Sequence, residues 1–332
     1  PTGVAGAGVL LTEGCRGEGG ILLNKDGYRY LQDYGLGPET PVGQPKNKHL
    51  ELGPRDRLSQ AFWQEQQKGR VIQGPMGDVV HLDLRHLGEK YLKERLPFIC
   101  ELAKAYVGVD PVKEPIPVRP TAHYTMGGIE TDGKCATRMP GLYAAGECAS
   151  VGLHGANRLG SNSLSEIVVF GKVAGEQAAE FAATQQHGNT EALAAKAEAL
   201  IKQHLSLMDI DGTENPADIR NELGMSMEAG VGIYRTEELM QGTIDKINEL
   251  KARYKKIKIN DKSSVFNTDL LYAIELGYML DVAEAMAHSA INRKESRGSH
   301  QRLDGYEERD DVNFLQHTLS FYAPEGAPTI DY

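Results

Sequence analysis

Residues 152–164 combine the groups that a binding site for an anion or an electron-rich ring requires. The stretch reads His154-Gly-Ala-Asn-Arg158-Leu-Gly-Ser-Asn-Ser163-Leu164, and glycines at 152, 155 and 160 let a ligand approach the backbone closely. An apolar pattern of helical period begins directly after it. Because unpaired N–H groups and the positive end of the dipole lie at a helix N-terminus, the pattern favours an electron-rich ligand beside Ser163 and Leu164.

Glu147 follows a short apolar run, residues 141–146. This order indicates a buried strand that ends at a glycine and delivers a carboxylate to a hydroxyl of a bound cofactor. The alternative is a tight packing turn between a strand and a helix. The closeness of Glu147 to the glycine-rich loop favours the binding interpretation.

Two further clusters of charge lie earlier in the chain. Thr12, Glu13 and Arg16 follow the strand-like residues 9–11, and Glu13 and Arg16 are near enough in sequence to exchange charge-assisted hydrogen bonds. A surface turn with an ordinary ion pair is the alternative. Arg55 follows a proline at the start of a helical pattern, where its guanidinium can bind a carboxylate with two hydrogen bonds or remain solvated.

His123 is the fourth candidate. It precedes Tyr-Thr-Met-Gly-Gly128 and follows a segment, residues 111–120, that holds four prolines. Histidine beside hydroxyl groups and a glycine pair indicates a loop that faces a ligand. A histidine with a purely structural role is the alternative.

These residues must be positioned by a mixed α/β arrangement followed by helices. We expect strands at residues 9–11, 20–24 and 79–84, and a long loop over residues 33–54. The expected helices cover residues 55–68, 89–106, 163–183, 237–257 and 267–291. The charged segment 293–300 forms either an interior network or a docking surface, and the sequence leaves both open.

Composition excludes several functional classes. The 332 residues carry a net charge of −10, which disfavours general binding to nucleic acid or anionic membranes. No apolar run approaches the roughly 18 residues of a membrane span. The four cysteines form no C-x-x-C pair, and His81 and His86 do not share a helix face, so neither a disulfide framework nor a metal site is predicted. Because the chain starts within a glycine-rich stretch (Gly3, Gly6, Gly8) without methionine, we expect an N-terminal part to be missing.

Taken together and in this order, the motifs resemble the flavoprotein subunits of bacterial quinol:fumarate reductases, within the succinate dehydrogenase and fumarate reductase family. The resemblance covers essentially the whole chain. It rests on residues 12–20 (TEGCRGEGG), 51–56 (ELGPRD), 123–128 (HYTMGG), 154–164 (HGANRLGSNSL), 293–300 (RKESRGSH) and 308–314 (ERDDVNF). Ser299 stands where the family usually has alanine. The 51–56 segment and the residues that follow it are more similar to the fumarate reductase branch.

The resemblance implies an α/β fold plus a helical domain: a partial, Rossmann-like FAD-binding domain, an α+β capping domain and a C-terminal helical bundle. Residues 1–119 would be the capping domain and 120–182 the C-terminal part of the FAD-binding domain. Residues 183–309 would be the helical domain, and 310–332 the start of a tail. The histidine that carries covalent FAD is expected in the missing N-terminal part.

The resemblance also implies residue roles. Reduced FAD would transfer a hydride to fumarate, while Arg55 donates the proton and Glu13 and Arg16 relay protons from solvent. Thr12, His123 and Arg158 would bind the substrate carboxylates. The cofactor would be held by Glu147, Ser163, Leu164 and Gly128.

The same resemblance implies partners and leaves rivals. An iron–sulfur subunit would supply electrons, and membrane anchor subunits would hold the complex at the cytoplasmic face of the bacterial inner membrane. The rivals are a succinate dehydrogenase that uses these residues in reverse, an L-aspartate oxidase, and an inactive fragment that acts only as a binding module.

Overall fold

The computed structural model describes residues 9–74, 77–186 and 188–332, so the glycines at 3, 6 and 8 lie outside the described residues. The chain divides into two compact units, residues 1–123 and 124–332. The division into four domains that the sequence suggests stays a prediction.

The first unit is built on a small antiparallel sheet. Its elements are α1 (Gly14–Gly17), β1 (Ile21–Leu23), α2 (Arg55–Gln67), β2 (Ile72–Gly74), β3 (Gly77–Asp83), α3 (Glu89–Arg95), α4 (Pro97–Val107) and β4 (Ile116–Val118), with short 3-10 turns at Tyr30–Tyr34, Leu50–Leu52 and Arg85–Leu87. Strand β3 pairs with β1, β2 and β4, with Leu22 opposite Leu82 and Leu82 opposite Ile116. Helices α2, α3 and α4 close the core over this sheet through Phe62, Leu92 and Ile99.

Two predicted elements of this unit are wrong. The helix expected over residues 89–106 is two helices, because Leu96 leaves the helical conformation before Pro97, as residues preceding a proline tend to do. The strand expected at residues 9–11 is also missing, since no described strand pairs with that segment. The predicted strands at 20–24 and 79–84 and the helix from Arg55 are confirmed.

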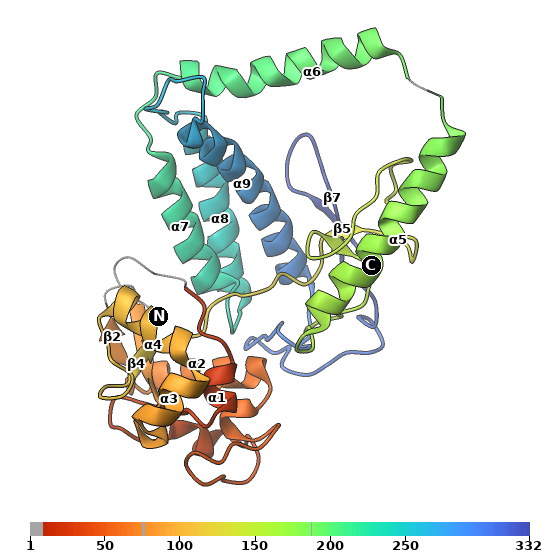
Figure 1. Cartoon of the computed structure of the whole chain (residues 1–332). Coiled ribbons are helices and arrows are strands. Elements are labelled where there is room, and N and C mark those ends of the chain that lie inside the picture. The colour runs from red at the N-terminus through yellow and green to blue at the C-terminus, as the bar shows by residue number, and fades with distance from the viewer. Residues whose placement is uncertain (1–8, 75–76, 187) are drawn as a thin grey trace. The chain divides into compact units, whose positions relative to one another are not determined.

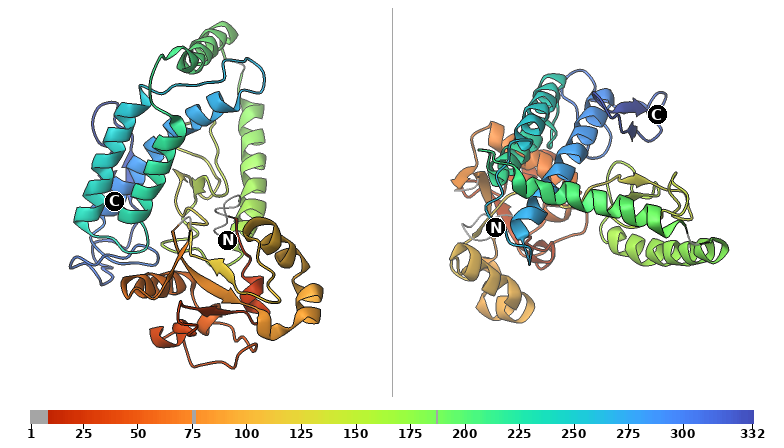
Figure 2. Two further views of the ribbon diagram at one scale, coloured as in Figure 1. Left: turned by 90° about the vertical axis from the view of Figure 1, so that its left-hand side faces the viewer. Right: turned by 90° about the horizontal axis from the view of Figure 1, so that it is seen from above.

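The second unit contains helices, the two short strand pairs β5–β6 and β7–β8, and isolated bridges. Its elements are β5 (Ile129–Glu130), β6 (Ala149–Ser150), α5 (Asn162–Thr184), α6 (Thr190–Leu205), α7 (Pro216–Gly230), α8 (Glu237–Tyr254), α9 (Thr268–Asn292), β7 (Leu319–Phe321) and β8 (Thr329–Asp331), with a 3-10 turn at Ser206–Asp209. Helices α7, α8 and α9 lie side by side as a bundle (Figure 1, Figure 2). Each begins at a side-chain cap, from Asn215, Thr236 and Asn267 respectively.

The predicted buried strand before Glu147 is wrong. Tyr143 makes one isolated antiparallel bridge to Ala136, and the strand β6 comes after Glu147. Gly141 and Gly146 both have positive φ angles, 84° and 83°, which interrupt an extended chain on either side of the apolar run. The run is therefore too short to pair as a strand.

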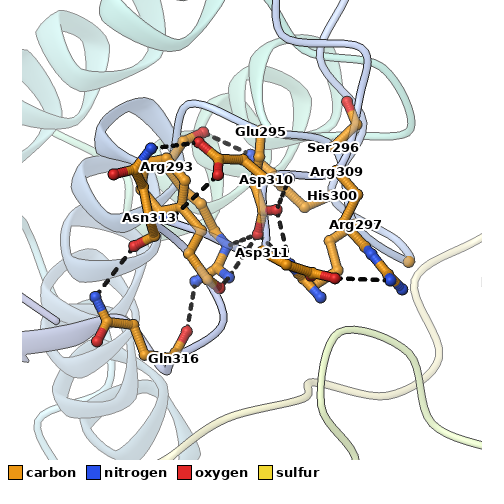
Figure 3. A network of polar contacts seen from close by, with 12 residues as sticks. Arg293, Glu295, Ser296, Arg297, His300, Arg309, Asp310, Asp311, Asn313 and Gln316 are labelled. Atoms are coloured by element: carbon orange, nitrogen blue, oxygen red, sulfur yellow. Dashed lines mark hydrogen bonds and ion pairs between the residues drawn. The ribbon is translucent and has the colours of Figure 1, made fainter.

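A buried ionic network follows α9 and holds residues 293–316 together (Figure 3). The Glu295 carboxylate is fully buried and accepts hydrogen bonds from Arg293, from Arg297 and from the Asp310 N–H, at 2.6–3.0 Å. Burial acts to raise the pKa of Glu295, but the hydrogen bonds from Arg297, Asp310 and Arg293 together bring it below its usual value. Two interpretations were left open for residues 293–300. The contacts of Glu295 with Arg293 and Arg297 agree with the interior network.

His300 is held neutral inside this network. Its Nδ1 accepts a hydrogen bond from Arg235 at 2.7 Å, so its Nε2 donates to the Arg293 carbonyl at 3.0 Å. Burial, with Arg235 and Arg302 nearby, lowers the pKa of His300 to about 4.

Among the described residues, no helix is long and apolar enough to cross a membrane.

We predict that Gly128→Ala destabilises the chain by about 2–5 kcal/mol. Gly128 has a φ of 134°, and a Cβ there would lie 2.5 Å from the Cys148 carbonyl oxygen, beside the parallel pair β5–β6. Gly133→Ala is the matched control, because nothing lies within 4 Å of its Cβ position. Thermal unfolding measures both, and equal melting temperatures for the two variants would contradict the packing argument.

We also predict that His300 makes the fold sensitive to acid. Its pKa of about 4 lies below the ordinary 6.5, so the unfolded chain binds a proton in this window that the folded chain does not. Stability present above pH 6.5 is therefore lost as the pH falls toward 4. Between about pH 7.5 and about pH 5, the wild type should lose about 2 kcal/mol more than His300→Gln. Urea unfolding followed by circular dichroism tests this, and equal losses in both proteins would refute it.

Candidate functional site

The first unit brings Glu13, Arg16 and Arg55 together. Arg55 Nε donates to Glu13 Oε2 at 2.9 Å, and its terminal nitrogen Nη2 makes a second hydrogen bond to the same oxygen. Arg16 Nη2 lies 3.8 Å from Glu13 Oε2, and Arg16 Nη1 donates to the Glu51 carbonyl at 2.6 Å. The three side chains thus form a continuous line of charge from Arg55 through Glu13 to Arg16.

A buried ion pair positions this line. The Glu51 carboxylate accepts from Arg29 at 2.8 and 2.6 Å and from the Leu22 N–H at 3.3 Å, which ties the turn before Arg55 to strand β1. Pro54 is extended and Arg55 begins α2, so its side chain leaves the helix at the first turn. Cys15 anchors α1 in the core next to Glu13.

The electrostatics of this cluster suit proton exchange more than covalent chemistry. The side chains of Glu13 and Arg55 are 42% and 52% exposed, so both are open to solvent. Burial lowers the pKa of Arg16, and the nearby Glu13 opposes that shift. Burial raises the pKa of Cys15 to about 11, which keeps it a thiol rather than a nucleophilic thiolate. The Thr12 hydroxyl accepts from the Gly14 N–H at 3.2 Å.

The second unit brings His154 and Arg158 together around a buried acid. Glu166, on the first turns of α5, accepts from the Tyr124 hydroxyl at 2.9 Å and lies 2.6 Å from His154 Nε2. The rings of Tyr124 and His154 meet edge to face, with centroids 5.4 Å apart. Burial and the hydrogen bond to Glu166 raise the pKa of Tyr124 to about 12, so it stays a neutral donor.

Arg158 rests on this cluster. Its guanidinium carbon lies 4.5 Å from the centre of the Tyr124 ring, and Nη1 donates to the Leu159 carbonyl at 3.3 Å. Its Nε is buried and has no hydrogen-bond partner among the described residues. A buried donor without a partner is unfavourable, so a ligand carboxylate that accepted from it would be stabilised.

Four cofactor candidates lie in the same unit. Glu147 is exposed and accepts from the Thr125 N–H at 3.0 Å, which ties the turn before β6 to the loop after His123. Ser163 and Leu164 lie in the first turn of α5, which starts at Asn162, and the Leu164 side chain is exposed. Gly128 abuts the backbone of Cys148. His123 is exposed at the end of the first unit.

Tyr124 and Glu166 were missed by the sequence analysis. A signal for Glu166 was available, because it is the one charged residue in the largely apolar helical run from Leu164 to Phe170. A buried carboxylate in such a run requires partners, and His154 and Tyr124 supply them. Nothing in the local pattern distinguishes Tyr124 from its neighbours.

Each unit, taken by itself, offers cationic groups that can bind a carboxylate. In the second unit Arg158 has a donor without a partner among the described residues, and in the first unit Arg55 and Arg16 provide positive charge. Within the described ranges, no group of three or more histidine, cysteine, aspartate or glutamate side chains is placed to hold a metal ion. All four cysteines are free.

Comparison with known proteins shows what the chain is similar to. A family model described as "FAD binding domain" matches residues 1–164, and one described as "Fumarate reductase flavoprotein C-term" matches residues 220–332. The whole chain is 71% identical to a fumarate reductase flavoprotein subunit of a Serratia species and 69% identical to that of Escherichia coli. A solved FrdA chain of E. coli quinol fumarate reductase, 69% identical, superposes with a TM-score of 0.94.

The chain spans about half the length of these relatives. It covers 56% of the Serratia protein, 55% of the E. coli protein and 57% of the solved chain, while each match covers all of this chain. The expected fold class, a partial FAD-binding domain with further α/β and helical parts, is confirmed by both family models and by the superposition. Over its full length the chain is similar to fumarate reductase flavoprotein subunits.

Proposed function

We propose that the polypeptide carrying this chain is the flavoprotein subunit of a fumarate reductase that reduces fumarate to succinate in anaerobic respiration. The observation that carries the proposal is the line Arg55–Glu13–Arg16, which joins a helix-start arginine to solvent through a carboxylate. The names of the relatives, with 69–71% identity, support the direction of the reaction.

FAD is the cofactor that the family model names. The first turn of α5 offers the backbone N–H groups and the positive dipole end that suit an electron-rich ring, so Ser163 and Leu164 are assigned to it. Glu147 is assigned to a cofactor hydroxyl, and Gly128 to the close approach of the loop. When bound, the flavin supplies the hydride; the chain's own residues orient the substrate and supply the proton.

The substrate is a dianion, and its recognition requires fixed cationic donors. Arg158 has a buried Nε without a partner, and Tyr124 and Glu166 hold the surrounding structure rigid. We assign Arg158 and His123 to one carboxylate and Thr12 to the other. Charge on a carboxylate end grows as the hydride arrives, so these fixed donors stabilise the transition state more than the ground state.

Proton delivery is assigned to Arg55. An arginine is normally protonated throughout, so it can act as an acid only toward a strongly basic carbanion and only if it is promptly recharged. Glu13 makes two hydrogen bonds with Arg55 through one oxygen, and it is itself open to solvent. Arg16 Nη2 also lies 3.8 Å from the same Glu13 oxygen, so two arginines flank this carboxylate.

We assign the electron supply to another subunit, and the four cysteines of this chain, which form no C-x-x-C pair, agree with that assignment. A second solved neighbour is a quinol–fumarate reductase with menaquinol, 70% identical, which supports a complex that also holds an iron–sulfur subunit and membrane anchor subunits. In that complex this chain would be peripheral, at the cytoplasmic face of the inner membrane.

The proposal predicts that Arg55→Lys, in the full-length subunit of the assembled enzyme, lowers kcat for fumarate by about 100-fold or more. Lysine keeps the charge but lacks the planar group that Glu13 binds through two nitrogens. Steady-state kinetics with a reduced dye as donor measures the effect. Arg57→Lys, an exposed position two residues along α2, is the matched control and should leave kcat unchanged. Full turnover in Arg55→Lys would refute the assigned role, and an enzyme without fumarate activity would favour a binding module.

Glu13→Gln separates proton supply from folding. The pair with Arg55 is exposed, so the loss of the charge should change the free energy of unfolding by less than about 1 kcal/mol. The relay should nevertheless fail, with kcat lowered roughly 10–100-fold and a larger solvent deuterium isotope effect. Normal turnover together with an unchanged isotope effect would show that Glu13 takes no part in proton supply.

A further inference from the structure

The loop that carries Arg158 is held by a turn far away in the sequence. Residues 297–300 form a tight turn closed by two backbone hydrogen bonds, from Arg297 N–H to His300 O at 2.8 Å and from His300 N–H to Arg297 O at 3.0 Å. At its tip, the Ser299 N–H and the Ser299 hydroxyl both donate to the Ala156 carbonyl, at 3.0 and 2.8 Å. Ala156 lies two residues before Arg158.

Gly298 brings the turn against the loop. Its φ is +56°, and a Cβ at this position would lie 2.6 Å from the Ala156 oxygen and 2.9 Å from its Cβ. A side chain there would therefore displace Ala156 by its own bulk as well as strain the turn. The turn and the loop meet at one carbonyl with no space between them.

The base of the turn is fixed by the buried network. Arg297 donates to both oxygens of Glu295, at 2.8 and 3.0 Å, and to Asp311 at 2.7 Å. His300 is fixed on both ring nitrogens by Arg235 and the Arg293 carbonyl. Figure 3 shows Arg293, Arg297 and Asp310 around Glu295. A turn with a rigid base transmits that rigidity to whatever its tip binds.

The loop itself has two further attachments. His154 is bound to Glu166, and the Arg158 guanidinium stacks on Tyr124. Both lie toward α5 and the loop after His123, whereas the Ala156 carbonyl is held from the opposite end of the chain, after α9. Without the turn, the loop between His154 and Arg158 would keep only its own glycine-containing backbone.

We propose that residues 297–300 are a clamp that positions the Arg158 loop, with Gly298 and Ser299 as positioning residues for substrate binding. This inference rests on the proposed function only in taking Arg158 as a substrate ligand. The Ser299 hydroxyl adds a second hydrogen bond to the one that the backbone makes, so its loss weakens the clamp and a side chain on Gly298 opens it.

The test compares Gly298→Ala with Gly305→Ala in the holoenzyme. Gly305 also has a positive φ, of 92°, but nothing lies within 4 Å of its Cβ position, so it reproduces the backbone strain without the contact. Hydrogen exchange followed by mass spectrometry reports the backbone of residues 153–160, and steady-state kinetics reports KM for fumarate. In Gly298→Ala, loop exchange should be at least 10-fold faster and KM at least 10-fold higher, with kcat changed less than KM. Gly305→Ala should match the wild type in both.

Ser299 provides a second test if Gly298→Ala does not fold. Ser299→Ala should make exchange of the loop roughly 2–10-fold faster, as the loss of one hydrogen bond predicts, and Ser299→Thr should restore it. Equal exchange in Gly298→Ala and Gly305→Ala, or no effect of Ser299→Ala, would overturn the clamp. Faster exchange with an unchanged KM would overturn its role in substrate binding. If the wild type does not reduce fumarate, the proposed function fails, and the exchange comparison still decides whether the clamp exists.

Discussion

The segment after α9 depends on one buried carboxylate, Glu295. An isolated charge in a protein interior is strongly unfavourable, so this position is possible only because Arg293, Arg297 and the Asp310 N–H all donate to it. The consequence is structural precision: each donor comes from a different part of the segment after α9, and all must be in place at once. Arg293 in turn donates to the carbonyls of Phe314 and Gln316, which brings the tail back to the end of the helix. Removing one partner would leave a buried charge that neither solvent nor another donor compensates. All the donors are therefore needed together.

A comparable arrangement operates in the first unit at a smaller scale. Glu51 is buried and paired with Arg29, while its own backbone carbonyl accepts from Arg16. The side chain thus fixes the turn before α2, and the backbone fixes the arginine beside Glu13. Burial separates the two kinds of acid in this protein. Glu51, Glu166 and Glu295 are buried and structural, whereas Glu13 is open to solvent and can exchange protons. That contrast is the physical reason to assign the relay to Glu13 rather than to the stronger ion pairs nearby.

The sequence was most informative where a local pattern and a tertiary role coincide. The apolar period of residues 237–257 and 267–291 predicted α8 and α9, because the buried faces of these helices repeat every three or four residues. The contact between Glu13 and Arg16 was likewise predictable, since the two lie one helical turn apart. Prediction failed where conformation depends on long-range partners. Residues 9–11 have strand-like side chains but no neighbouring strand among the described residues, and the run before Glu147 is interrupted by Gly141 and Gly146. The roles of Glu166 and Tyr124 become visible only once the fold places His154 beside both of them.

The clamp on Ala156 belongs to the same class of long-range effect, and it gives a reason for the charge density of residues 293–300. Every residue has a backbone carbonyl, so the sequence around Ala156 cannot predict that its carbonyl accepts hydrogen bonds from Ser299. The signal is found instead at the other partner, where Gly298 has a conformation and a closeness to its neighbour that a side chain would not permit. Burying a glutamate among arginines has a large desolvation penalty, and apolar packing would stabilise the tail without that penalty. They are a suitable way to hold a turn in one orientation, since ionic hydrogen bonds are directional. The network therefore serves to fix the position of Ser299 at the tip of the turn, and Ser299 in turn holds the loop that carries Arg158.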